Sequence, residues 1–170
     1  YVMYKLGTPI HTYDASKING VIKSVILSEE EKYIGLDESE YTLKPGNLVI
    51  KDDNKTISLA SVLGSSDTKV TNETTTISVE VGMFDPVAVR KTATVIGKKT
   101  DASMRGEKRV DQKQASNAIA LLVSILSETN SNIEVSNVVD VLKESEVKKI
   151  SLKAIDLAKI TGIIIDWNIA

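Results

Sequence analysis

The stretch "LKPGNLVIKDDNKTISLASVLG", from Leu43 to Gly64, decides the fold of this chain. Pro45-Gly46 predicts a turn, and the apolar run Leu48–Lys51 predicts a strand directly after it. Asp52-Asp53-Asn54 supplies the residues of a second turn, from which Thr56–Leu63 returns as the next strand. We therefore expect a β-hairpin in this part of the chain.

The segments on either side of this hairpin also carry strand signals. Gly20–Leu27, "GVIKSVIL", is a β-branched run. The stretch "TTTISVEVGMF" alternates between two predicted faces, one with Ile77, Val79 and Val81 and the other with Ser78 and Glu80. On this pattern alone, Glu80 is expected to be a carboxylate that faces solvent. Residues 133–142, "IEVSNVVDVL", are expected to add a strand that closes the sheet.

Three segments carry helix signals. In "DPVAVRKTATVIG" Asp85 is placed to cap a helix that Gly97 ends. After Asp111, a plausible N-cap, apolar residues recur at helical spacing and are expected to pack in the core. These residues are Ala115, Ile119, Leu122, Val123 and Leu126. The tail from Lys143 is charged and then helical, with Gly162 as its expected stop.

Composition narrows the class of protein. Hydrophobic residues make up 42% and charged residues 26% of the chain, which is typical of globular proteins. The net charge of −2 provides no overall field that would attract nucleic acid. The lack of cysteine excludes disulfides and cysteine-ligated zinc, and it fits a reducing cytoplasm. No apolar run approaches the roughly 20 residues of a membrane helix, so no membrane is expected.

These patterns together favour an α+β fold. We expect a layered domain of mixed or antiparallel β-sheet with flanking helices, followed by a short helical C-terminal segment. The chain opens without an initiator methionine or a signal peptide, which indicates a fragment of a longer protein.

Two features of the sequence are candidates for a functional site, one for proton transfer and one for phosphate binding. His11 is the only histidine in 170 residues, and a free imidazole titrates near pH 6.5. Residues 98–109, "KKTDASMRGEKR", are expected to form a loop that is either simply solvated or in contact with phosphate. Its basic residues are Lys98, Lys99, Arg105, Lys108 and Arg109. The chain has no phosphate-binding loop, dinucleotide fingerprint, nucleophile elbow or calcium loop.

Four segments, in order, resemble the editing domain of the bacterial phenylalanyl-tRNA synthetase beta chain. "YVMYKLGTPIHTYD" is similar to the pattern Asn-Tyr-Val-x-x-x-Leu-Gly-Gln-Pro-x-His-Ala-Phe-Asp. "LVIKDDNKTISLASVLG" resembles a Leu-Val-Ile-x-Asp strand followed by an Ala-Gly-Val-Met-Gly-Gly turn. "ISVEVGMFDPVAVRKTA" resembles a glutamate strand and a Phe-x-Pro helix start. "TDASMRGEKRVD" is similar to Thr-Asp-Ala-Ser-x-Arg-x-Glu-Arg-Gly-Val-Asp.

The resemblance implies a domain organisation and a task. Residues 1–142 correspond to the editing domain, with a β–β–α arrangement, and residues 143–170 to a linker and the start of the next small helical domain. The implied task is to hydrolyse tyrosine that has been attached wrongly to phenylalanine tRNA. In this role His11 lies close to the scissile ester, and Glu80 accepts a hydrogen bond from the phenol. The other implied pocket positions are Ala60, Ser61, Gly64, Thr100 and Ala102.

Departures from the pattern keep a second hypothesis open. Ser61, Ser65 and Arg109 each stand where the pattern has glycine, and Ser61 adds bulk to the implied pocket. The domain is then either an editing hydrolase or a structural and tRNA-contact module without editing activity. The first alternative predicts that Glu80 and His11 share one pocket with Ala102 nearby, whereas the second predicts that Ser61 fills it. The tail argues against a third alternative, a free-standing editing factor.

The resemblance also implies partners and cofactors for the larger enzyme. The parent is a class II ligase that uses ATP and magnesium, and its synthetic active site lies in an alpha chain. The implied assembly is a heterotetramer of two alpha and two beta chains that acts on phenylalanine tRNA in the cytoplasm. No cofactor or metal is expected for the fragment itself.

Overall fold

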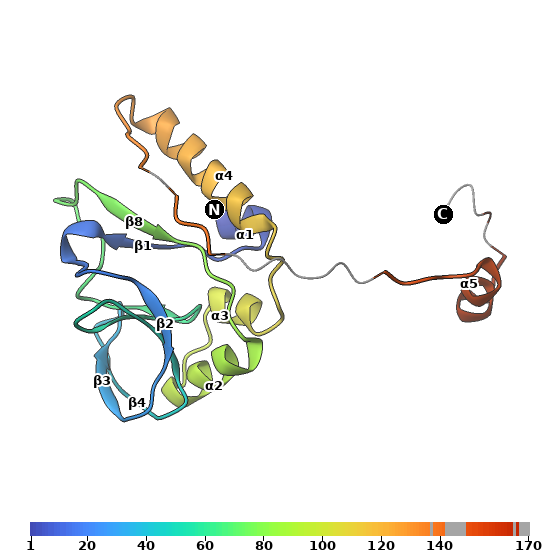
Figure 1. Cartoon of the computed structure of the whole chain (residues 1–170), viewed down its shortest axis with the longest axis horizontal. Helices are drawn as coiled ribbons and strands as arrows, with labels where there is room; N and C mark the ends of the chain where they lie inside the picture. Colours follow the sequence, from blue (N-terminus) through green and yellow to red (C-terminus); the bar gives the residue numbers. More distant parts are fainter. Residues whose placement is uncertain (137, 142–148, 165, 167–170) are drawn as a thin grey trace. The chain divides into compact units, whose positions relative to one another are not determined.

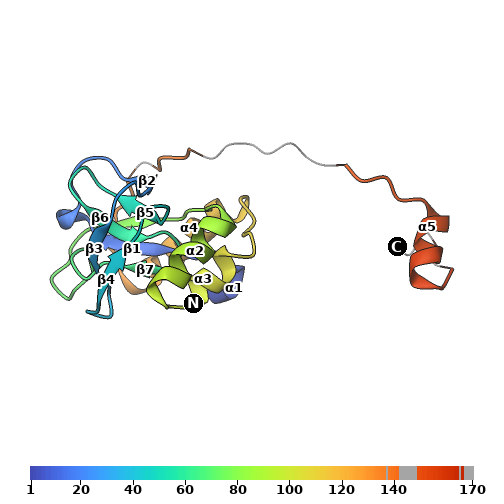
Figure 2. The same cartoon turned by 90° about the horizontal axis from the view of Figure 1, so that it is seen from below.

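The computed structural model describes residues 1–136, 138–141, 149–164 and 166. The chain divides into two compact units, Tyr1–Ser136 and Asn137–Ala170. Strands and helices of the first unit are drawn in Figures 1 and 2, from blue near the N-terminus to orange near residue 130. The predicted domain boundary at Leu142 lies outside the described residues.

The largest sheet of the first unit contains the predicted hairpin. Its order is β2-β5-β6-β7, with bounds Lys23–Ile26, Leu48–Lys51, Thr56–Leu59 and Leu63–Gly64. All its neighbours are antiparallel. The hairpin forms as predicted, except that the returning segment is broken between β6 and β7. The break coincides with Ser61, whose φ of 55° lies in the left-handed region and turns the chain.

Two smaller antiparallel pairs complete the strands of the described residues. One pairs β1 (His11–Asp14) with β8 (Ile77–Glu80), and the other pairs β3 (Glu31–Ile34) with β4 (Glu40–Leu43). A single bridge between Gly35 and Ser65 ties the second pair to the end of β7. Antiparallel strands together with helices confirm the α+β fold expected from the sequence.

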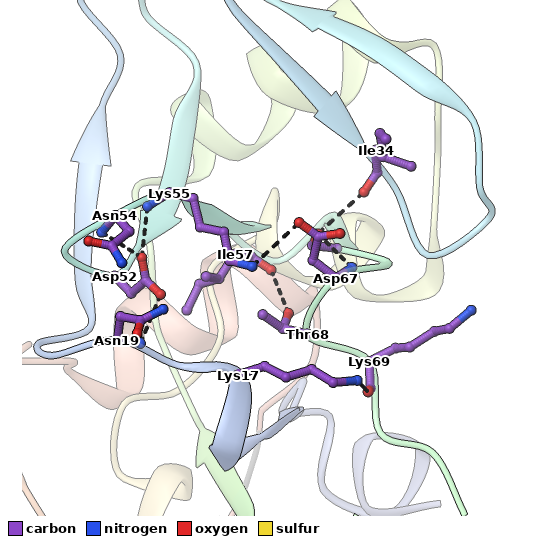
Figure 3. A network of polar contacts seen from close by, with 11 residues as sticks. Lys17, Asn19, Ile34, Asp52, Asn54, Lys55, Ile57, Asp67, Thr68 and Lys69 are labelled. Atoms are coloured by element: carbon purple, nitrogen blue, oxygen red, sulfur yellow. Dashed lines mark hydrogen bonds and ion pairs between the residues drawn. The ribbon is translucent and has the colours of Figure 1, made fainter.

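A polar network fixes the turns around this sheet (Figure 3). Asp52, in the turn between β5 and β6, accepts hydrogen bonds from the backbone N–H groups of Asn19, Asn54 and Lys55. On the other side, the Ile57 carbonyl accepts from the Ser65 backbone and the Thr68 hydroxyl. These hydrogen bonds therefore fix the backbone in the turn before β6 and in the segment after it.

Helix α2 (Pro86–Ile96) begins and ends as predicted. The Asp85 carboxylate accepts a hydrogen bond from the Ala88 backbone, and Gly97 closes the helix in the left-handed conformation. The expected loop at residues 98–109 is partly wrong, because Asp101–Gly106 forms a helix, α3. Thr100 and Ser103 cap its first turn reciprocally. Figure 2 shows α2 and α3 side by side, and they are in contact.

Helix α4 (Gln114–Thr129) confirms the long predicted helix but not its expected burial. Its N-cap is Lys113, and Asp111 instead accepts the Lys113 backbone N–H in the turn before it. Only Ala118 is fully buried among the described residues of α4, and the predicted apolar stripe is half-buried. The helix packs on α1 (Val2–Leu6), which the sequence analysis did not predict. A five-residue helix is too short to cover a stripe of four turns.

The strand expected at residues 133–142 is wrong for the described part of that segment. Residues 133–136 and 138–141 adopt no strand, and Val139 and Val141 are each 86% exposed. A β-branched composition favours a strand only where a neighbouring edge supplies hydrogen bonds. In the second unit, α5 (Ala154–Thr161) forms and Gly162 ends it in the left-handed conformation, as predicted.

Candidate functional site

His11 and Glu80 stand directly opposite each other in the β1–β8 pair. Opposite residues of an antiparallel pair project to the same face of the sheet. The only histidine and the strand carboxylate therefore meet, although 69 positions separate them in the sequence numbering. This is the arrangement that the editing alternative predicts.

Both side chains line one pocket with a free volume of about 80 Å³. One ordered water needs only about 10–15 Å³ by this measure, so the pocket has room for several. Residues from four regions of the chain line it: Pro9, Ile10, His11, Ser58, Leu59, Ser61, Val62, Leu63, Gly64, Glu80, Gly82, Phe84 and Ala102. Four of the predicted pocket residues thus join His11, namely Glu80, Ser61, Gly64 and Ala102.

Burial keeps the His11 imidazole neutral. Desolvation lowers its pKa to about 4, well below the usual value near 6.5. The ring packs edge-on against Tyr13, with 4.5 Å between centroids. Gly64 makes room for it, because a Cβ there would lie 2.4 Å from Cε1 and 2.7 Å from Nε2 of His11. Within the described part of the chain, the ring nitrogens have no hydrogen-bond partner and are free to hold water or substrate.

Glu80 points into this pocket and not to solvent, which corrects the expectation from strand alternation. Val79 is the exposed neighbour, at 37%. The alternation itself holds, but the polar face is the enclosed one, because Glu80 lies in the pocket that Ser58, Leu59 and Ala102 also line. Burial raises the pKa of the Glu80 carboxyl, and a hydrogen bond from the Tyr13 hydroxyl works in the opposite direction.

Ser61 lines the pocket without closing it. Its side chain rests against helix α3, where a Cβ on Gly106 would lie 3.0 Å from the Ser61 Cβ and 3.3 Å from Oγ. Ser61 and Arg109 both have positive φ, at 55° and 65°. The two positions therefore keep the left-handed backbone that a glycine of the family pattern accommodates without strain.

Two predicted pocket residues lie outside the lining. Ala60 is 1% exposed and packs in the hydrophobic core. Thr100 caps α3, and its hydroxyl donates to the Val62 carbonyl at 2.9 Å. Thr100 thereby ties α3, which carries Ala102, to the pocket wall. Ser65, the third departure from the pattern, is buried and accepts a hydrogen bond from the Asp67 backbone.

The basic residues of 98–109 are not equally available. Lys98 forms an ion pair with Asp37 at 3.0 Å, and Lys99 lies 4.0 Å from Glu107. The Arg105 guanidinium stands 5.1 Å from the centre of the Tyr4 ring and donates to the Asp101 carbonyl. Lys108 and Arg109 are exposed, and no partner is recorded for their side chains in the described residues. Of the five basic residues in this segment, Lys108 and Arg109 are therefore the ones whose charges are available to a phosphate.

Some residues in or directly beside the pocket were not predicted from the sequence. Tyr13 is fully buried, and its hydroxyl contacts both Glu80 and Ser58. Alternation along β1 could have found it, because positions 11 and 13 share a face. Gly82 and Phe84, unlike Tyr13, line the pocket itself, and the Phe84 ring packs against Gly82.

The described residues meet the requirements neither of a three-ligand metal site nor of a membrane-spanning helix. In this part of the chain no three His, Cys, Asp or Glu side chains lie close enough together to hold a metal ion. None of the helices in the described residues combines the length and the apolar character that a membrane crossing demands.

Comparisons with known proteins show the family of this chain. The profile of the B3/4 domain family matches residues 1–131. A phenylalanine–tRNA ligase beta subunit from Fusobacterium nucleatum is 36% identical over 95% of this chain, and one from Colwellia psychrerythraea is 37% identical over 74%. A third, from Aliivibrio fischeri, is 34% identical over 96%. The chain spans about a fifth of these relatives, at 20%, 16% and 20% of their lengths.

Proposed function

Because this chain belongs to the B3/4 domain family, we propose that it is the editing domain of a phenylalanine–tRNA ligase beta subunit. In this proposal it hydrolyses tyrosine mischarged on phenylalanine tRNA. The names of its relatives support the ligase, and one observation supports the editing step above all: His11 and Glu80 face each other within one pocket.

The pocket has the chemistry to separate tyrosine from phenylalanine. A hydrophobic pocket rejects an added hydroxyl only about a hundredfold, whereas a site built to hydrogen-bond that hydroxyl discriminates by on the order of ten-thousand-fold. Glu80 provides the acceptor for a phenol, and Phe84, Leu59 and Leu63 provide apolar walls. Phenylalanine in the same place leaves one oxygen of the buried Glu80 carboxylate without a hydrogen-bond partner, which costs binding free energy.

His11 supplies the polar group beside the ester. Hydrolysis adds water to the ester carbonyl and breaks the bond to the terminal ribose, releasing tyrosine and the ribose hydroxyl. A base with a pKa of about 4 is a weak proton acceptor at neutral pH, so His11 orients the attacking water through a hydrogen bond. A hydroxyl of the same ribose assists in moving the proton. Positioning alone accounts for much of the rate of such a step.

The ligase reaction of the parent enzyme, as distinct from the hydrolysis, lies in this proposal on another chain. We assign its ATP and magnesium to the synthetic site of an alpha subunit. The assembly of two alpha and two beta chains, its action on phenylalanine tRNA and its place in the cytoplasm belong to the same proposal. Lys108 and Arg109 are the side chains best placed to contact the tRNA backbone.

The test is release of tyrosine from preloaded phenylalanine tRNA by the intact two-subunit enzyme. His11→Ala should slow release strongly, and Glu80→Ala should remove the preference for the tyrosyl ester. Glu40→Ala, which removes an exposed carboxylate on β4, is the matched control and should release tyrosine at the unmodified rate. Equal release with and without enzyme would refute the proposal.

A second candidate function rests on Ser61. Its side chain lies in the pocket lining where the family pattern has glycine, so the domain would serve packing and tRNA contact without hydrolysis. In that case the unmodified enzyme releases no tyrosine. Restored release in Ser61→Gly would identify the serine as the block.

A further inference from the structure

Tyr13 connects the two polar side chains of the pocket. It is fully buried, its ring packs edge-on against His11, and its hydroxyl donates a hydrogen bond to Oε2 of Glu80. No other side chain of the described residues donates a hydrogen bond to the Glu80 carboxylate. The position of this carboxylate thus depends on one phenol.

The Tyr13 hydroxyl is itself held in place. Its oxygen lies 2.7 Å from Oγ of Ser58 on β6, so the hydroxyl sits between a strand of the large sheet and the end of β8. With the Ser58 hydroxyl donating to the Tyr13 oxygen, the Tyr13 hydroxyl donates its own hydrogen bond to Glu80. Such a chain of hydrogen bonds is cooperative and restrains each member.

Glu80 keeps one oxygen for a ligand. Oε2 is taken by Tyr13, while Oε1 lies on the side of Gly82, 3.1 Å from where a Cβ on that residue would be. Gly82 lines the pocket. A substrate phenol that enters can therefore reach Oε1 without displacing Tyr13.

We propose that Tyr13 is a positioning residue that sets substrate specificity, by holding Glu80 with its free oxygen turned toward the phenol of a bound tyrosyl group. This inference rests on the proposed editing function. The Tyr13 hydrogen bond also favours the ionised carboxylate, which accepts from a phenol more strongly than the neutral acid does. The family pattern has phenylalanine at this position, so Tyr13→Phe is a substitution that the fold should accept.

The experiment compares hydrolysis of tyrosyl and phenylalanyl esters of phenylalanine tRNA by the intact enzyme. Tyr13→Phe should lower the tyrosine preference, as the ratio of kcat/KM values, by roughly tenfold, which is the worth of one charge-assisted hydrogen bond. The loss should appear in KM for the tyrosyl ester more than in kcat. Tyr41→Phe is the matched control, because it removes a phenol bonded to Asp37 outside the pocket, and it should leave the preference unchanged.

A second measurement separates this inference from the proposed function. The Glu80 carboxyl is titrated by carbon NMR in the chain with and without the Tyr13 hydroxyl. A higher pKa of Glu80 in Tyr13→Phe supports the positioning role, even if the unmodified enzyme hydrolyses neither ester. Failure to hydrolyse either ester would refute only the proposed editing function. An unchanged Glu80 pKa, or an unchanged or stronger tyrosine preference in an active enzyme, overturns the inference.

Discussion

His11 lies against Gly64 so closely that a single added methyl group would occupy the space of the imidazole. A Cβ on Gly64 would stand 2.4 Å from His11 Cε1, and 2.7 Å from Leu36 Cδ1. Gly64 on β7 and His11 on β1 therefore pack directly against each other, although the two strands belong to different sheets. The position of the polar group beside the ester depends on this contact.

Gly64→Ala is expected to displace His11 and to slow tyrosine release by roughly a hundredfold, the usual effect of a misplacement near 1 Å. The double variant Gly64→Ala with His11→Ala should be no slower than His11→Ala alone, because both changes remove the same group. The measurement is single-turnover release from preloaded tRNA. Additive losses in the double variant would show that Gly64 acts apart from His11.

A suitable control for Gly64→Ala is Gly97→Ala. Gly97 has φ of 66° at the end of α2, with nothing within 4 Å of a Cβ and no place in the pocket lining. Alanine there should destabilise the chain by about 1 kcal/mol through backbone strain. Tyrosine release should not change, which separates loss of stability from loss of the site.

Local chemistry made most of the fold predictable. The Asp52 turn and the Asp85–Gly97 helix depend on side chains within a few residues, and both form as predicted. Helix α3 was not predicted although its signal is local: Thr100 and Ser103 form a capping box in which serine takes the place of the usual Glu or Gln at the third helical position. The strand at 133–142 was wrong because a partner edge is a long-range requirement.

The pocket was predictable mainly through the family resemblance. His11 stood out by itself as the only histidine, whereas Glu80 was expected on its pattern alone to face solvent and became a pocket candidate only through the resemblance. The register of β1 with β8 then brings the two together. Tyr13 and Ser58 act through contacts between strands 45 positions apart, which no local pattern reveals. Alternation predicted that Glu80 and Val79 face opposite ways, but the face that is enclosed depends on contacts with residues of β6 that lie far away in the sequence.

Buried neutral His11 makes stability depend on pH. Its pKa is about 4 in the folded chain and near 6.5 when unfolded, so the unfolded state binds more protons between these values. The free energy of unfolding should therefore fall as the pH drops from about 6.5 toward 4. Urea unfolding at pH 6.5 and 5 should show this loss, and His11→Gln should abolish it. An equal loss in His11→Gln would assign the effect to carboxyl groups.

Asp52 should be essential to the hairpin. Burial alone would raise the pKa of its carboxyl, yet backbone donors from Asn19, Lys55 and Asn54 hold that pKa below the usual value. In Asp52→Asn an amide group must face one of these donors, which should cost about 1–3 kcal/mol of unfolding free energy. Asp53→Asn is the neighbouring control, since Asp53 is exposed and should cost at most about 0.5 kcal/mol. Equal costs would contradict the role of the Figure 3 network.

Ser61→Gly and Arg109→Gly form a pair that separates backbone strain from pocket volume. Both positions have positive φ, where a non-glycine residue lowers the free energy of unfolding by roughly 1 kcal/mol. Glycine removes this strain, but its greater freedom in the unfolded chain offsets part of the gain. Each variant should therefore be slightly more stable, by about 0.5 kcal/mol, in urea unfolding.

Only Ser61 lines the pocket, so only Ser61→Gly enlarges the space for a phenol ring. It should lower KM for the tyrosyl ester, whereas Arg109→Gly should affect tRNA binding alone and change its salt dependence by about one phosphate contact. An effect of Ser61→Gly on stability without any on KM would mean that the serine side chain, which leans on Gly106, already leaves the substrate its full space.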